Sequence, residues 1–189
     1  MQDLYIDKQA YRDGSNLSDV KSKYGYVEQK TSHFYIPKQQ IIIWRGSEKD
    51  EIDDVIAEIE KMGNKRIKTT VITCSMHKDP VLGYQELARH IQLIPDSIVL
   101  AFIGRSNGAG PTLSANTLVP VITIPVSWEK FPEDIWSSLR TPSSVPVMTM
   151  LYKQNACLAA LQILAQRNPQ LYMQLQQTRI GRNRNFVMW

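Results

Sequence analysis

Residues 97–111 read SIVLAFIGRSNGAGP, in which a run rich in apolar and β-branched residues ends at Ile103 and a glycine-rich loop follows at once. A continuous apolar run of this length is typical of a strand buried on both faces, as in parallel sheets. Gly104, Gly108 and Gly110 then give the backbone conformational freedom and allow its close approach to a ligand. This stretch predicts a parallel strand with a binding loop at its carboxyl end.

The rest of the chain repeats this organisation. Short apolar runs predict further strands at 40–44, 69–73, 119–124 and 147–151. Apolar residues at helical spacing predict helices at 50–62, 80–91, 131–139 and 155–166. Strands that alternate with helices indicate βαβ units with right-handed crossovers. We therefore expect an α/β fold, a three-layer α/β/α sandwich with a parallel, flavodoxin-like sheet.

Composition limits the class of protein. A chain of 189 residues with 43% hydrophobic content can bury a core, and Cys74 and Cys157 are too few for a disulfide framework or a metal knuckle. No apolar run reaches the roughly 18 residues that cross a membrane, and residues 1–12 lack the apolar core of a secretory signal. We expect a cytoplasmic protein with no metal and no membrane partner.

The formal net charge of +4 includes a basic segment near the end of the chain, with Arg179, Arg182 and Arg184. Basic tails attract nucleic acid in some proteins. A solvated terminal segment explains so modest a charge more simply, so we predict no nucleic-acid partner.

Two other loops at the carboxyl ends of predicted strands carry polar groups. Ser47 and Asp50 follow the first strand and lead into a predicted helix, whose N-terminal N–H groups and dipole favour a phosphate. A plain helix cap explains the same residues equally simply. His77 and Lys78 follow the second strand and supply a proton-transfer group and a positive charge. Taken alone, this pair is also compatible with a solvated loop.

The third loop adds hydrogen-bond donors at Ser106 and Asn107. It is not a Walker loop, because no Gly-Lys-Ser/Thr follows, and it lacks the glycine spacing of a dinucleotide-binding fingerprint. We therefore predict neither a nucleoside triphosphate nor a nicotinamide cofactor.

Together these motifs resemble those of a known family, the class II phosphoribosylaminoimidazole carboxylase domain of the bifunctional purine-synthesis enzyme of animals. Gly46–Asp50 is similar to the family's Gly-Ser-x-Ser-Asp loop, and Ser75–Pro80 to its Ser-Ala-His-Lys-Gly-Pro loop. Gly104–Pro111 matches the Gly-Arg-Ser-Asn-Gly-x-Gly-Pro loop throughout, and Asp134–Arg140 resembles the Val-Trp-Ser-Ser-Leu-Arg motif. Several motifs in the right order make the resemblance specific.

The resemblance implies a reversible addition of carbon dioxide to the imidazole carbon of aminoimidazole ribonucleotide (AIR) without ATP, biotin, metal or any other cofactor. It also implies a homo-octamer with sites shared between subunits. Catalytic roles fall on His77, which handles the proton, and on Lys78. The substrate-binding residues that it implies are Ser47, Asp50, Ser75, Arg105, Ser106, Asn107 and Gly108.

We predict three parts in the chain. Residues 1–39 form an N-terminal arm that resembles the end of a succinocarboxamide synthetase (SAICAR synthetase) domain, 40–168 form the carboxylase-like domain, and 169–189 form a C-terminal helix and basic tail. The resemblance covers only the end of that domain, and we expect the rest of it to be missing from this chain. Two explanations stay open: a piece of a longer protein, or a separate gene that kept the carboxylase half.

Four substitutions in the first two loops depart from the family pattern. Arg45 replaces a methionine, Lys49 a serine, Met76 an alanine and Asp79 a glycine. We expect Met76 to add bulk next to His77, and Asp79 to place a negative charge beside the phosphate seat and to lose the positive φ open to glycine. These expectations support an alternative function, a non-catalytic paralogue with a binding or structural role.

Overall fold

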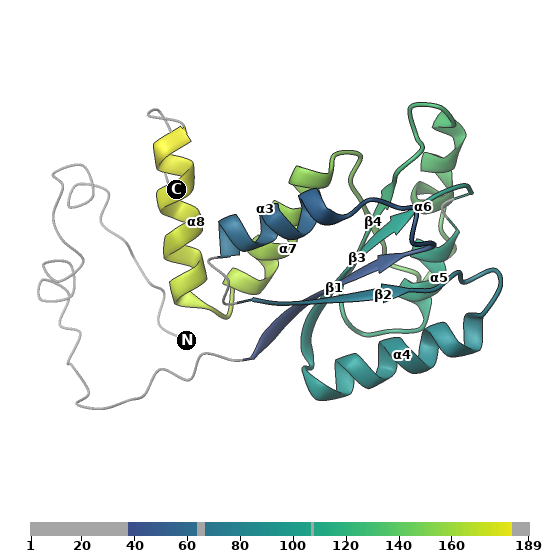
Figure 1. Ribbon diagram of the computed structural model, residues 1–189, viewed down its shortest axis with the longest axis horizontal. Helices are drawn as coiled ribbons and strands as arrows, with labels where there is room; N and C mark the ends of the chain where they lie inside the picture. The colour runs from purple at the N-terminus through teal and green to yellow at the C-terminus, as the bar shows by residue number, and fades with distance from the viewer. Residues whose placement is uncertain (1–37, 64–66, 107, 183–189) are drawn as a thin grey trace, which may run out of the picture. The chain divides into compact units, whose positions relative to one another are not determined.

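The computed structural model describes residues 38–63, 67–106 and 108–182, which lie within one compact unit, Ile36–Arg182 (Figure 1). Nearly all of the predicted N-terminal arm, the tail from residue 183 and Asn107 lie outside the described residues. Predictions made for them therefore stay predictions.

The described chain forms a five-stranded sheet in which every pair of neighbouring strands is parallel, in the order β2-β1-β3-β4-β5. This order is that of flavodoxin-like folds, so the predicted α/β class is confirmed. The strands are β1 Gln39–Arg45, β2 Lys68–Thr73, β3 Asp96–Ile103, β4 Val121–Pro125 and β5 Met148–Thr149.

Helices connect the strands, and each predicted helix has a counterpart. They are α3 Asp53–Gly63, α4 Pro80–Leu93, α5 Ala109–Ala115, the 3-10 helix η1 Pro132–Ile135, α6 Trp136–Leu139, α7 Lys153–Ala165 and α8 Pro169–Arg182. Four details differ from the sequence prediction. Helix α3 begins at Asp53 instead of 50, the helix predicted at 131–139 divides into η1 and α6, β5 has only two residues, and α5 was not predicted.

Alternate residues of the strands point to opposite faces, and each face carries its own hydrophobic cluster. Ile41 and Ile43 lie in one cluster with residues of α3, α7 and α8, while Ile42 and Trp44 lie in the other with residues of α4 and α5. Figure 1 shows α3 and α7 on one side of the sheet and α4 on the other. The sheet is therefore the middle layer of three.

Helix α8 packs on the same core as α3 and α7. Its Leu171 and Leu175 are 4% and 7% exposed and belong to the cluster that contains Val55 of α3 and Leu161 of α7. The described part of α8 therefore packs on the core of the unit Ile36–Arg182.

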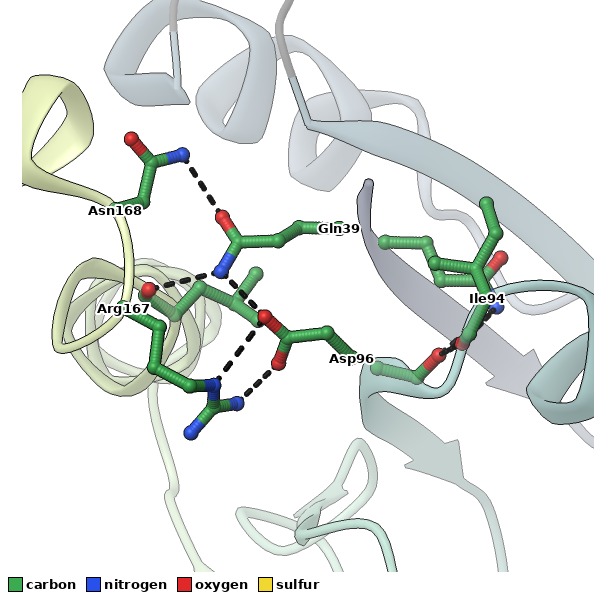
Figure 2. A network of polar contacts seen from close by, with 8 residues as sticks. Gln39, Ile94, Asp96, Arg167 and Asn168 are labelled. Carbon is green, nitrogen blue, oxygen red and sulfur yellow. Dashed lines mark hydrogen bonds and ion pairs between the residues drawn. The ribbon is translucent and has the colours of Figure 1, made fainter. Parts of the chain in front are cut away.

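The amino-terminal edge of the sheet is closed by a polar network, which Figure 2 shows. Gln39 Nε2 donates to Asp96 Oδ2 at 2.7 Å and to the Leu164 carbonyl oxygen at 3.0 Å, and Asn168 Nδ2 donates to Gln39 Oε1 at 2.9 Å. Arg167 forms an ion pair with Asp96. The network ties β1 and β3 to the corner between α7 and α8.

Candidate active site

The three predicted loops begin at one edge of the sheet, because their strands are parallel and adjacent. Arg45, the last residue of β1, pairs in register with Thr73 of β2 on one side and with Phe102 of β3 on the other. In open parallel sheets this carboxyl edge is where ligands bind, next to the point where the strand order reverses. Here that point lies between β1 and β3.

The first loop folds into a turn closed by Asp50. The Ser47 N–H donates to Asp50 Oδ2 at 2.9 Å, and the Asp50 N–H donates back to the Ser47 carbonyl oxygen at 3.2 Å. This turn closes before α3 begins at Asp53, so the predicted direct entry from Asp50 into a helix is wrong. The Ser47 side chain remains exposed at the edge, where it is accessible to a ligand.

Arg45 holds this turn against the neighbouring strand. Its Nε donates to Thr73 Oγ1 at 2.7 Å, and its Nη1 donates to the carbonyl oxygens of Glu48 and Asp50 at 3.3 and 3.4 Å. The guanidinium group therefore links the first loop to β2 through hydrogen bonds. A methionine, which is usual in the family at this position, has no N–H groups for these bonds.

The second loop forms a tight turn over Ser75. Its carbonyl oxygen accepts the N–H groups of Lys78 at 3.0 Å and of Asp79 at 2.9 Å, just before α4 starts at Pro80. His77 and Lys78 are both exposed at the crest of this turn. The turn presents the two side chains outward while its backbone is internally bonded.

The structure corrects two of the three expectations about the substitutions in this loop. Met76 is 8% exposed, and a Cβ added at Gly83 would lie 2.8 Å from its sulfur, so Met76 fills the core beneath α4 and does not crowd His77. Asp79 has a φ of −131°, so the position does not require the left-handed backbone of glycine. The expected effect of its negative charge on phosphate binding stays a prediction.

The third loop approaches the second through His77. A Cβ added at Gly108 would lie 3.7 Å from His77 Nε2 and 3.9 Å from Ser106 Oγ. Gly108, Ser106 and His77 therefore lie close together, although they come from loops after different strands. This contact is the geometric basis of the candidate site.

Ser106 has a left-handed backbone, with a φ of 64°. Such a conformation costs a residue other than glycine about 1–2 kcal/mol, so neighbouring contacts must hold it. The Ser106 N–H donates to Asp134 Oδ1 at 2.9 Å, across 28 residues of sequence. Asp134 was not among the predicted site residues. The one available signal was its place at the start of the Asp134–Arg140 motif.

Gly110 is needed for close packing inside the protein. We had predicted that the glycines of this loop allow the backbone to approach a ligand. A Cβ at this position would lie 2.6 Å from Thr123 Oγ1 and 2.7 Å from Thr123 Cβ, so only glycine lets α5 lie this close to β4. A Cβ at Gly104 would meet no atom within 4 Å. The glycines of this loop therefore have different physical roles.

Cys74 lies beside the second loop but is a poor nucleophile. It is buried, and its Sγ donates to the Asp79 carbonyl oxygen at 3.4 Å. Burial and, to a smaller extent, the charge of Asp79 raise the pKa of its thiol. A thiolate is therefore disfavoured, so Cys74 is not a candidate for proton transfer.

The structure distributes the predicted site residues as follows. It brings His77, Ser106 and Gly108 together, and it pairs Ser47 with Asp50 in a separate turn on the neighbouring strand. The guanidinium group of Arg105 lies over the Phe131 ring, 5.0 Å from the ring centroid. Asn107 is outside the described residues.

The described part of the chain contains neither a metal-binding cluster nor a membrane-spanning helix. No group of three or more His, Cys, Asp or Glu side chains is arranged to hold a metal ion. No helix there has the length and apolar character needed to span a membrane.

Comparison with known proteins adds independent observations. The chain is 30% identical over 194 residues to the bifunctional phosphoribosylaminoimidazole carboxylase/phosphoribosylaminoimidazole succinocarboxamide synthetase of Drosophila melanogaster, covering 97% of this chain and 44% of that protein. It is 33% identical over 125 residues to the phosphoribosylaminoimidazole carboxylase of Archaeoglobus fulgidus, covering 66% of this chain and 68% of that one. The chain spans only 40–44% of the length of the animal relatives it matches.

A solved structure supports the fold. The crystal structure of Treponema denticola PurE superposes with a TM-score of 0.71 at 23% identity, covering 76% of this chain and 91% of that one. The model of the family described as AIR carboxylase matches residues 40–185, which include all three loops. The chain therefore belongs to the AIR carboxylase family.

Proposed function

We propose that this chain catalyses the reversible, ATP-independent carboxylation of AIR to carboxyaminoimidazole ribonucleotide (CAIR), a step of purine biosynthesis. The observation that carries the proposal is the approach of His77 to the glycine-rich loop at Gly108, beside the Ser47–Asp50 turn. Membership of the AIR carboxylase family supports it, as do the relatives named phosphoribosylaminoimidazole carboxylase.

In the carboxylation direction, the enamine-like imidazole carbon of AIR attacks the carbon of carbon dioxide. One C–C bond forms, and one C=O electron pair moves to oxygen and becomes the new carboxylate. The ring carbon then carries an extra proton, which a base must remove to restore aromaticity. We assign this transfer to the His77 imidazole, which in the reverse direction returns the proton to the same carbon.

The remaining residues bind and orient the substrates. We assign the phosphate and ribose to Ser47, Asp50 and Lys78, because an exposed hydroxyl, a carboxylate and an ammonium group lie on the two turns of neighbouring strands. Ser75 is part of the second turn, and Arg105 belongs to the third loop. Ser106, Asn107 and Gly108 are assigned to carbon dioxide and the new carboxylate, because hydrogen-bond donors at that point stabilise the developing charge.

We further propose that the protein is a cytoplasmic homo-octamer with sites at subunit boundaries. Large exposed apolar side chains support an assembly: Leu118, Trp136 and Leu139 are 104%, 58% and 58% exposed. Exposed apolar groups of this size favour contact with another protein surface. Sedimentation of the purified chain measures the size of the assembly directly.

The function is tested by the decarboxylation of CAIR, followed by ultraviolet absorbance. Turnover is expected in the wild-type chain, and His77→Ala lowers kcat about 10²- to 10⁴-fold because general acid–base catalysis is lost. The matched control is His90→Gln in the last turn of α4, which leaves turnover unchanged. A folded wild-type assembly without turnover, or equal turnover in His77→Ala, contradicts the proposal.

A further inference from the structure

The left-handed backbone of Ser106 determines how the glycine-rich loop reaches His77. Ser106 has a φ of 64°, and two residues later Gly108 faces His77 Nε2. A change of φ at Ser106 to the usual negative region redirects the chain that follows. The position of Gly108 beside His77 therefore depends on whatever holds Ser106 in this conformation.

Asp134 provides that restraint from a buried position. It lies in η1, it is 8% exposed, and its own N–H donates to the Phe131 carbonyl oxygen at 3.1 Å. Its Oδ1 accepts the Ser106 N–H at 2.9 Å, and its Oδ2 has no hydrogen-bond partner among the described residues. The Ser106 N–H is therefore the described partner of this buried side chain.

The same segment contacts the preceding residue of the loop as well. The Arg105 guanidinium lies over the Phe131 ring at 5.0 Å, and Lys130 Nζ lies 5.6 Å from the same ring centroid. Residues 105 and 106 are thus both held by the segment Phe131–Asp134, one through a ring face and one through a carboxylate. Two contacts from adjacent residues fix an orientation that a single contact leaves free to rotate.

We propose that Asp134 is a positioning residue for carboxylation. Its carboxylate holds Ser106 in the left-handed conformation and so places Gly108, and the hydrogen-bond donors assigned to carbon dioxide, beside His77. This inference rests on the proposed function. Asp134 acts through Ser106 and does not itself need to touch the substrate.

The kinetic test compares Asp134→Ala with Asp134→Asn. The asparagine keeps an acceptor at the Oδ1 position, so its kcat/KM stays within about 3-fold of wild type, while the alanine lowers kcat/KM by roughly 10- to 100-fold. The loss in Asp134→Ala is expected mainly in kcat, with the folded fraction measured in the same sample. If Asp134 is only structural, the folded fraction falls and the kinetics of the folded protein do not change, which overturns the proposal.

A second readout does not depend on activity. Trypsin cleaves after Arg105, at the peptide bond whose N–H Asp134 holds, so releasing the loop exposes this bond to the protease. We expect Asp134→Ala to be cleaved there about 10-fold faster than wild type, and Asp134→Asn at the wild-type rate. Cleavage after Arg45, the last residue of β1, is the internal control and should not change.

The kinetics and the trypsin cleavage together distinguish a failure of the proposed function from a failure of the positioning role. An inactive wild-type chain overturns the proposed function, whereas unchanged cleavage after Arg105 in Asp134→Ala overturns the positioning role itself. If Asp134→Ala does not fold, Asp134→Ser takes its place, because a serine hydroxyl is polar but too short to reach the Ser106 N–H. Wild-type cleavage and kinetics in Asp134→Ser equally overturn the proposal.

Discussion

The two edges of the sheet are built in opposite ways. At the amino edge, Gln39 is 3% and Asn168 is 3% exposed, and their side chains bond to each other and to neighbouring groups. At the carboxyl edge, Ser47, His77 and Ser106 are exposed, and the N–H groups of Ser47 and Ser106 donate to the carboxylates of Asp50 and Asp134. The first arrangement holds elements together, and the second leaves side chains accessible.

This difference has a simple physical cause. A polar group taken out of water costs free energy unless it is paired, so the buried side chains of the amino edge use their hydrogen-bonding groups on the protein itself. An exposed group stays solvated and can exchange water for a ligand at little cost. The comparison predicts that changes at the amino edge reduce stability and changes at the carboxyl edge reduce activity.

The largest effect on stability is expected from Gln39→Leu. The substitution removes the acceptor of Asn168 and the donor to the Leu164 carbonyl oxygen, and unpaired buried groups cost about 1–3 kcal/mol each. We expect the free energy of unfolding to fall by about 3 kcal/mol in urea titrations, with KM unchanged in the folded fraction.

Ser47→Ala is the matched control at the opposite edge. It should change the free energy of unfolding by less than about 1 kcal/mol while raising KM for the nucleotide. Equal losses of stability in Gln39→Leu and Ser47→Ala contradict the division of roles between the edges.

A somewhat smaller effect sharpens the comparison within the glycine-rich loop. Gly110→Ala places a Cβ 2.6 Å from Thr123 Oγ1, and overpacking of this kind costs typically 1–3 kcal/mol. Gly104→Ala in the same loop meets no atom within 4 Å and should have a much smaller effect on stability. If thermal unfolding finds the two variants alike, the close packing of α5 on β4 is wrong.

The smallest expected effect is the pH dependence of stability that arises from His90 at the amino edge. Burial, and then the charge of Arg89, lower the pKa of His90 in the folded chain, with Glu86 acting in the opposite direction and Lys68 in the same direction as Arg89. The unfolded chain binds the His90 proton more readily. The contribution of neutral His90 to the free energy of unfolding is therefore complete above the pKa of His90 in the unfolded chain, about 6.5. It is lost as the pH falls through the pKa of His90 in the folded chain.

The measurement is the urea midpoint between about pH 7.5 and pH 5.5. The midpoint should fall over this range in the wild-type chain and fall less in His90→Gln. An identical fall in both proteins shows that His90 does not contribute.

Much of the fold could be predicted from sequence because the central strands are strongly marked. The apolar runs at 40–44, 69–73 and 97–103 predicted β1, β2 and β3 to within one residue at each end. The shorter elements have too few residues to show a hydrophobic pattern from which they could be predicted. Helix α5 has seven residues that include Gly110 and Pro111, which are not typical of a helix, and β5 has two residues at the sheet edge.

The candidate site could be predicted only in part. The loops were identified because loops after parallel strands meet at one edge, and the motifs pointed to His77 and Gly108. The role of Asp134 depends on a contact with Ser106 that spans 28 residues, and the inward position of Met76 depends on its packing against Gly83. Contacts between distant residues of this kind do not follow from local pattern.

Amide hydrogen exchange with and without saturating CAIR tests the central claim, that the carboxyl edge is the nucleotide site. We expect slower exchange on binding in residues 46–50, 75–78 and 104–106, and unchanged exchange in residues 94–97 and 164–168 at the amino edge. Protection confined to other segments, or no protection in these three loops at saturation, would contradict it.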